Sequence, residues 1–302
     1  MIVICNKSTI MTQNLSKSLK IAVLLVVSVL FSAFSTNSTA TKMSIFDALK
    51  SKSIGASIVS NGKHNGNSVD LKITNLTNQY IELIIPAGTK YSTAADDEQT
   101  LIQIEDKFIA LQPKQTYTGN AAAFCTEASD RCPTSSSAMT ISKNTNPKFT
   151  ELSEYIKGKS IDKSTFQDAV WAISDGYSVS NISAEDQVSI DFRKKVADIT
   201  GQKNPWFNSP QNVTIDDRGN FNMETVLIAG QLEFMCNKGT MVHQDIYKAN
   251  GEAVLISDKT MQARYGNVKY RFQMQVKGWE KGDYYIKLHD GTNEITRYEF
   301  SV

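Results

Sequence analysis

Histidines are the first residues that could give this chain a catalytic or metal-binding role. His64, His243 and His289 lie far apart in the sequence, and no two of them are spaced as an i, i+4 pair on a helix. A zinc protease needs such a pair, so the sequence gives no support for that class. His64 lies in an Asn-Gly turn, where we expect it to be solvated. His243 and His289 alternate with apolar residues, which favours structural histidines on strands.

Cysteine chemistry is the second possibility, because Cys125 and Cys132 bracket the short sequence CTEASDRC. In an oxidising compartment this spacing predicts a disulfide, worth roughly 2–3 kcal/mol by loop closure. Half of a metal site is the alternative, but no further thiols or imidazoles lie nearby, so we predict no metal and no cofactor. Cys236 lies in the apolar run LEFMCN, which favours a buried inert thiol over a nucleophile paired with His243.

Acidic and aromatic residues supply the remaining candidates. The acid clusters at 96–98, 105–106 and 216–217 lack the spaced calcium-loop pattern and predict solvated turns. The chain has no Gly-x-Ser-x-Gly elbow, and nothing in it selects a carboxylate pair for glycoside hydrolysis.

The best candidates for a carbohydrate platform are Trp206, Phe207 and Trp279, which lie in turns or linker-like sequence. Trp171 lies in a helical pattern, so we expect it in the core. We predict no catalytic residue.

An apolar run near the N-terminus sets the expected compartment. Residues 21–34 (IAVLLVVSVLFSAF) follow Lys17 and Lys20, and small residues end at Ala40, a pattern typical of a signal peptide over residues 1–40. We therefore expect a secreted or surface protein, with the periplasm and an uncleaved N-terminal anchor as alternatives. The net charge of +1 gives no electrostatic reason to expect a nucleic-acid partner.

Hydrophobic periodicity predicts two β-sandwiches joined by a helical segment. Residues 41–148 alternate apolar and polar positions, as in Val69, Leu71 and Ile73, although 132–148 reads as a long surface loop. Residues 149–203 change to a helical period, and residues 221–302 return to short strands with an Asn250-Gly251 hairpin turn. Pro205 and Pro210 mark residues 204–220 as a linker.

Three predicted helices fill residues 149–203. Phe149, Leu152, Tyr155 and Ile156 lie on one face of the first. Ser164 and Gln167 form a capping-box pattern for the second, which ends near Gly176. The third spans residues 184–199.

Two resemblances accompany this pattern. The segments VHQDIYKANGEAVL and GWEKGDYYIKLHDGTNEITRYEFSV resemble immunoglobulin-like C-terminal domains of secreted Bacteroidetes proteins, including sorting domains of the type IX secretion system. The first unit is similar to a group of bacterial secreted immunoglobulin-like domains, through IIPAGT, AFC and the helix Gln167–Asp175. These resemblances imply two immunoglobulin-like β-sandwiches and an extracellular compartment, and they imply no reaction.

Together these features favour a non-catalytic module for binding, adhesion or envelope structure. The expected partner is a polysaccharide or another envelope protein. The alternative is a glycan-acting extracellular hydrolase with two acids about 5–10 Å apart in an interdomain cleft. A structural subunit with exposed edge strands as contacts is a third possibility.

Overall fold

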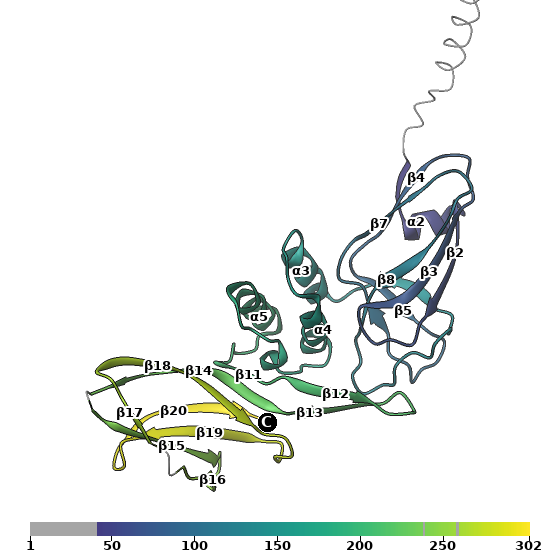
Figure 1. Ribbon diagram of the computed structural model, residues 1–302. Coiled ribbons are helices and arrows are strands. Elements are labelled where there is room, and N and C mark those ends of the chain that lie inside the picture. Colours follow the sequence, from purple (N-terminus) through teal and green to yellow (C-terminus); the bar gives the residue numbers. More distant parts are fainter. Residues whose placement is uncertain (1–40, 238, 258–259) are drawn as a thin grey trace, which may run out of the picture.

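A computed structural model describes residues 41–237, 239–257 and 260–302 of the 302-residue chain. The fold is mainly β, with 44% strand and 17% helix, and a helical segment around residues 147–200 separates two β regions (Figure 1). The predicted leader, residues 1–40, lies outside the described residues. Within those residues, no helix combines the length and apolar character that crossing a bilayer requires.

The N-terminal β region packs three small sheets and one short helix around a single core. The sheet orders are β2-β3-β8, β1-β4-β7 and β10-β5-β6-β9, and β1 pairs with β4 in parallel. The predicted alternation is confirmed in β3, where Val69, Leu71 and Ile73 are buried. The elements are β1 (Thr41–Ser44), α2 (Ile45–Lys50), β2 (Ile54–Ser60), β3 (Asn67–Asn75), β4 (Ile81–Ile85), β5 (Thr89–Ser92), β6 (Leu101–Ile102), β7 (Lys107–Leu111), β8 (Thr116–Ala122), β9 (Phe124–Cys125) and β10 (Thr140–Lys143).

The segment 132–148, predicted as a surface loop, is partly ordered as a strand. Its β10 pairs antiparallel with β5, and Met139 lies in the core. The prediction was wrong because β10 is short and has a single apolar residue, Ile141, between exposed polar ones, so it shows no strand periodicity.

The helical segment shares a core with the first β region. The predicted face of the first helix is confirmed, since Phe149, Leu152 and Ile156 are buried. They pack in one cluster with Ile102 and Phe124 of the β region. The elements are α3 (Pro147–Ile156), the 3-10 turns η1 (Lys163–Thr165) and η2 (Val179–Asn181), α4 (Phe166–Ser174) and α5 (Gln187–Thr200).

The predicted capping box at Ser164 and Gln167 is not formed. Asp162 caps the short turn η1 instead, and α4 begins at Phe166. The Gln167 side chain turns to β9, where its oxygen accepts the Cys125 N–H at 3.1 Å and its nitrogen donates to the Cys125 carbonyl at 2.9 Å. A long-range contact therefore overrides the local capping pattern.

The C-terminal β region packs two sheets face to face. One has the order β11-β14-β18 and the other β16-β15-β19-β20, with β17 also on β15. Their inner faces bury Leu232, Phe272, Ile246 and Ile286 in one core. The strands are β11 (Phe207–Asn208), β12 (Gln211–Ile215), β13 (Phe221–Thr225), β14 (Leu227–Cys236), β15 (Met241–Lys248), β16 (Ala253–Leu255), β17 (Thr260–Gln262), β18 (Gly266–Gln275), β19 (Asp283–His289) and β20 (Glu294–Ser301).

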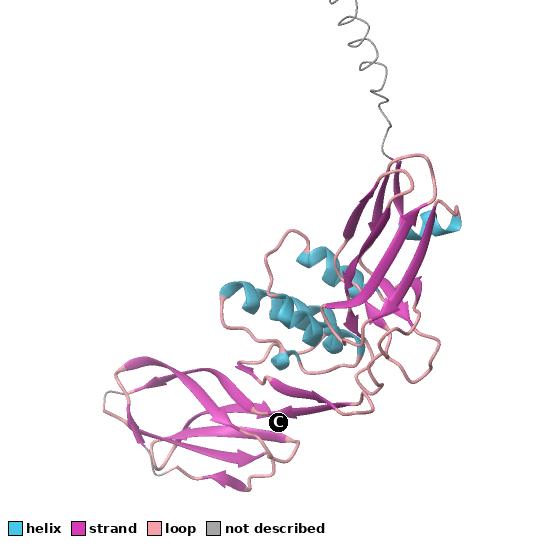
Figure 2. Ribbon diagram, turned by 45° about the vertical axis from the view of Figure 1, so that its right-hand side comes forward, coloured by secondary structure: helices cyan, strands magenta, loops and turns pink. Residues whose placement is uncertain are grey.

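The segment 204–220 holds strands rather than an irregular linker. Strand β11 enters the C-terminal sheet, and β12 pairs with β13 in a hairpin. Figures 1 and 2 show this hairpin passing beneath the helices toward the first β region. There the Gly219 carbonyl accepts the Cys132 N–H at 2.9 Å. The hairpin thus joins all three parts of the molecule.

Candidate functional site

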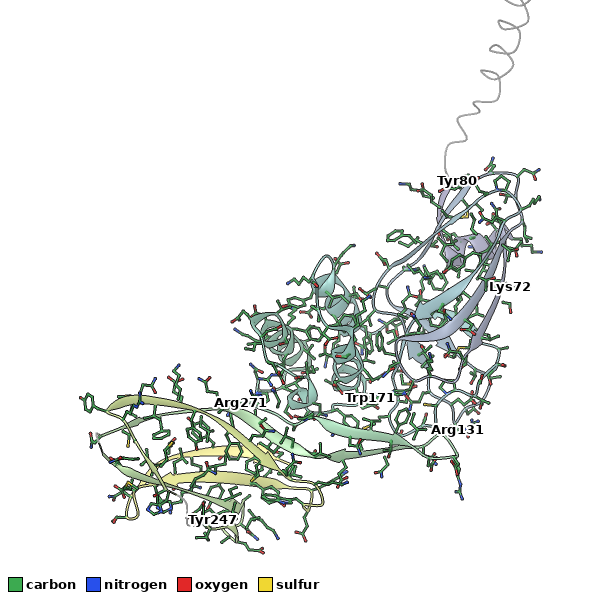
Figure 3. The ribbon with its side chains drawn as sticks, in the orientation of Figure 1. Lys72, Tyr80, Arg131, Trp171, Tyr247 and Arg271 are labelled. Atoms are coloured by element: carbon green, nitrogen blue, oxygen red, sulfur yellow. The ribbon has the colours of Figure 1, made fainter. Side chains whose placement is uncertain are left out.

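An aromatic cluster seals the junction between the hairpin, α4 and the first β region. The His64 and Trp171 rings stack at 6.4 Å, and Phe221 of β13 meets both rings edge-on at 5.3 and 5.5 Å. Burial here lowers the pKa of His64, which corrects the expectation of a solvated turn histidine. Trp171 is buried in the core as predicted (Figure 3), and its indole N–H has no partner among the described residues.

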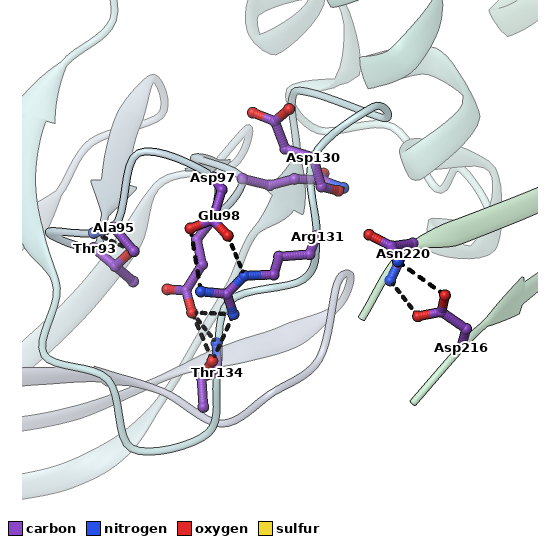
Figure 4. A network of polar contacts seen from close by, with 10 residues as sticks. Thr93, Ala95, Asp97, Glu98, Asp130, Arg131, Thr134, Asp216 and Asn220 are labelled. Atoms are coloured by element: carbon purple, nitrogen blue, oxygen red, sulfur yellow. Dashed lines mark hydrogen bonds and ion pairs between the residues drawn. The ribbon is translucent and has the colours of Figure 1, made fainter. Parts of the chain in front are cut away.

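An ion-pair network fixes the loop that meets the hairpin tip (Figure 4). Arg131 binds Asp97 and Glu98, each at 2.8 Å, and Glu98 also accepts the Thr134 hydroxyl at 2.6 Å. Glu98 is therefore buried instead of lying in a solvated turn. Burial opposes its ionisation, but hydrogen bonds from Thr134 and Thr93 lower the pKa of Glu98 below its ordinary value. Arg131 pairs with both acids, so the network holds this loop in place.

The cysteine pair lies at the two ends of this loop. Cys125 and Cys132 are both buried, and the structure contains them as free thiols without a disulfide. Their side chains hydrogen-bond to each other. Burial raises the pKa of Cys125 well above its usual value, whereas the hydrogen bond from Cys125 lowers that of Cys132. The two sulfurs are thus adjacent, and the disulfide stays a prediction.

Two carboxyls with raised pKa values lie on one face of α4 and its C-cap. Burial raises the pKa of Asp168 to about 7. Burial also raises that of Asp175, against hydrogen bonds from Ser174 and Ala128. Seven residues of helix separate the two acids by about 10 Å along the axis. Trp171 lies between them on the same face, and neither acid lines any of the three cavities described for this molecule.

Two histidines that are distant in sequence meet on the outer face of the C-terminal sheet. His243 and His289 are paired across β15 and β19, with their rings stacked at 5.0 Å. The His289 Nε2 atom lies 2.9 Å from a carboxylate oxygen of Asp245, which is buried. The contact gives His289 a structural role, because a buried carboxylate needs hydrogen-bond partners, and His243 stacks on His289 without contacting Asp245.

Two cavities lie on the two sides of Trp206, between the helical segment and the C-terminal sheets. One has a volume of about 490 Å³ and the other of about 760 Å³, and both are lined by Pro205 and Trp206. We call this pair of cavities the Trp206 groove. Its smaller part is lined by α5, β14 and β18, and its larger part runs along β19 and β20.

Three contacts hold Trp206 in place. Its indole Nε1 donates to the Glu299 carbonyl of β20 at 2.6 Å. Its ring meets Tyr298 and Phe272 at 5.3 and 5.9 Å. A Cβ atom on Gly230 would lie 2.6 Å from the Trp206 carbonyl and 2.8 Å from its ring, so only glycine permits this approach.

Arg193 of α5 fixes the segment that carries Trp206. Its buried guanidinium donates to the carbonyls of Pro205 and Phe207, each at 3.0 Å, and to the side chains of Asn204 and Asn208. No acid pairs with this cation among the described residues, and burial lowers its pKa. Arg193 is therefore a positioning residue for the groove.

The walls of the groove combine aromatic rings, amides and charged groups. The smaller part is lined by Gln231, Gln273 and Arg271, the last labelled in Figure 3, and by Glu185. In the larger part, the guanidinium of Arg297 lies 4.1 Å from the ring centroid of Tyr285. Such a mixture gives orientation through polar groups and affinity through ring faces.

The structure separates the three predicted platform residues. Trp206 is half-buried at the rim shared by both cavities, but Phe207 is a core residue of β11 that turns mainly inward. Trp279 packs against Tyr284 with centroids at 5.2 Å and lines neither part of the groove. Cys236 is half-buried at the end of β14, beside the exposed Met235, so the LEFMC run is less buried than predicted.

Sequence reasoning missed Arg193 and Gly230, although each left a signal. Arg193 shares the apolar stripe of α5 with Val196 and Ala197, and a cation there needs buried acceptors. Gly230 interrupts the strand run LIAGQL, which indicates a close approach by another group.

Within residues 41–302, leaving out 238 and 258–259, no group of three or more His, Cys, Asp or Glu side chains could hold a metal ion. The sequence matches no protein-family model, and no curated protein is detectably similar to it.

Proposed function

We propose that this protein is a secreted, non-catalytic binding module with two immunoglobulin-like β-sandwiches, and that it holds a polysaccharide chain in the Trp206 groove. The observation that carries the proposal is the half-buried Trp206 ring, which forms the rim between cavities of about 490 and 760 Å³. A groove that continues past an aromatic rim suits an extended polymer better than a compact small molecule.

The groove chemistry supports a sugar ligand. A sugar ring has an apolar C–H face that packs on Trp or Tyr rings, and a rim of hydroxyls that both donate and accept. Gln231 and Gln273 offer amides, and Arg271 offers a planar donor group. Trp206 and Tyr298 offer aromatic rings in the same groove.

A glycan-acting hydrolase remains the weaker proposal. It needs two carboxyls that converge on one glycosidic bond. In the groove, Glu185 lies on one side of Trp206, whereas Asp283 and Glu299 lie on the other. The Asp283 carboxylate already accepts the Ser301 hydroxyl at 2.7 Å.

Binding can be tested by native electrophoresis through gels that contain xylan, galactomannan, mixed-linkage β-glucan or soluble peptidoglycan. We expect one of these polymers to slow the full-length mature protein. Trp206→Ala should weaken that binding roughly 10–100-fold, because a buried aromatic contact contributes about 1–3 kcal/mol.

Trp279→Ala is the matched control, since it removes a half-buried tryptophan outside the groove. It should leave the retardation unchanged. Arg271→Ala changes an exposed residue of the groove and should weaken binding while the core stays intact. It therefore distinguishes weaker polysaccharide binding from unfolding of the protein. Absence of retardation by every polymer, or equal retardation of the Trp206→Ala protein, would contradict the proposal.

We also propose that Cys125 and Cys132 form a disulfide in the oxidising compartment that the leader indicates. Oxidised glutathione can accept the two electrons and two protons that the thiols release, so the S–S bond closes without a metal. Trypsin cuts after Arg131, inside the loop. A non-reducing tryptic map should therefore show two peptides joined through these cysteines, and the bridge should add roughly 2–3 kcal/mol of stability.

Cys236→Ser is the control for this map and should leave the linked peptides unchanged. Linkage of Cys236 to either partner, or free alkylation of Cys125 and Cys132 after oxidation in native buffer, would count against the bridge.

A further inference from the structure

The backbone of β18 has one side without a neighbouring strand. The register pairs Leu227 with Gln275 and continues to Cys236 with Gly266, and the Val276 N–H donates to the Val226 carbonyl at 3.0 Å. In an antiparallel pair, bonded and non-bonded positions alternate. The even-numbered residues of β18 therefore bond to β14, and the odd-numbered residues turn their N–H and C=O groups away from it.

At two other places in this sandwich, side chains cap backbone groups that no strand pairs. The Tyr298 hydroxyl accepts the Glu233 N–H at 2.8 Å and donates to the Glu233 carbonyl on β14. The Trp206 indole N–H donates a hydrogen bond to the Glu299 carbonyl on β20. On β18, no such cap reaches the outward groups from any described part of the chain. Figure 1 shows β18 at the margin of its sheet.

The side chains along β18 define what could pair with it. The side chains of the odd-numbered residues lie on the exposed face of the sheet. They include Lys269 and Arg271 and no acid. Lys269 binds Glu233 at 2.9 Å, but Arg271 has no ion-pair partner within the described residues. The inward-facing row contains half-buried apolar side chains, among them Val268 and Met274. An added strand would cover this row and meet an uncompensated positive charge on the other face.

We propose that the β18 edge accepts an extended strand from a partner protein in which acidic residues alternate with apolar ones. Its backbone would bond to the odd-numbered residues 267–275, its apolar side chains would cover the inward row, and an acid would face Arg271. Pairing with a second copy of this chain is disfavoured, because a two-fold axis at Arg271 places two arginines opposite each other. This proposal does not rest on polysaccharide binding.

Exposed apolar residues at one end of the strand extend the surface. Tyr265, just before β18, is 79% exposed, and Met235, the cross-strand partner of Asn267, is 70% exposed. Two large exposed side chains beside an open edge favour contact with a partner.

The test uses a fluorescein-labelled peptide of about nine residues, a usual strand length, that alternates valine with glutamate. We expect its anisotropy to rise when the full-length mature protein is added, and the same peptide with lysine in place of glutamate to bind at least roughly tenfold more weakly. Hydrogen exchange should slow at the amides of Lys269, Arg271 and Gln273 and stay unchanged at Glu299.

Lys269→Pro removes one outward N–H and leaves the ladder to β14 intact, because residue 269 is an outward position. It should weaken peptide binding by roughly tenfold or more, whereas Lys269→Ala, which keeps the N–H, should bind clearly better than the proline variant. Retardation by polysaccharide should be the same in both variants. The proposal is overturned by equal binding of the proline and alanine variants, by no binding at about 1 mM peptide, or by a dimer of the chain in sedimentation that blocks the peptide.

Discussion

Replacing Asp168 with asparagine is expected to stabilise the protein by about 4 kcal/mol at pH 8. Burial raises the pKa of this carboxyl to about 7, compared with 3.8 when it is exposed. Below pH 3.8 the carboxyl is protonated in both the folded and the unfolded chain. As the pH rises from there to about 7, the unfolded chain loses this proton first, so the free energy of unfolding falls, and above pH 7 it levels off.

Urea unfolding at several pH values measures this effect. Between pH 5 and pH 8 the wild type should lose about 3 kcal/mol that the Asp168→Asn protein keeps. Asp198→Asn on α5 is the matched control, because it makes the same substitution at an exposed position of a neighbouring helix. If the free energy of unfolding changes with pH equally in the wild type and in Asp168→Asn, this carboxyl does not resist ionisation.

Replacing Arg193 with methionine is expected to cost roughly 3–5 kcal/mol, because methionine fills the space but leaves several buried acceptors without donors. Those acceptors include the carbonyls of Pro205 and Phe207, which frame Trp206. The substitution should therefore lower the melting temperature and also weaken polysaccharide retardation, although Arg193 is not required to touch the ligand.

Two comparisons separate positioning from general stability. Arg193→Lys keeps the charge but cannot reach four acceptors at once, so it should restore part of the stability and little of the binding. Lys194→Met, at the adjacent exposed position, should change neither. If the Arg193→Met protein binds polysaccharide as well as the wild type at a temperature where it is folded, Arg193 is not a positioning residue for the groove.

The sequence predicted those helices and strands that form because of their own pattern of apolar residues. The helix α3 was predicted because Phe149, Leu152 and Ile156 recur at the helical period. The start of α4 could not be predicted, because the Gln167 amide is engaged by the backbone of Cys125, 42 residues away. Strand β11 is only Phe207–Asn208 and forms by pairing with β14. Two residues are too few to show the alternation of apolar and polar side chains that predicts a strand.

The site was predictable only in part, for the same reason. Trp206 could be proposed because it lies in linker-like sequence beside Pro205, where an exposed ring was expected. The depth of the groove depends on Arg193 and Gly230, which contact the Trp206 segment only after α5 and β14 have come together. His64 illustrates the opposite error, since its turn sequence indicated solvent and the hairpin residue Phe221 covers it.

The hairpin β12–β13 determines where the molecule can be divided. Phe221 covers the His64 and Trp171 rings, and Gly219 occupies the Cys132 N–H, yet both residues follow the helical segment in the chain. A proteolytic fragment ending at residue 203 would leave those rings and that amide open to water. The smallest N-terminal fragment that keeps its own surface intact therefore ends after Thr225, with the hairpin included.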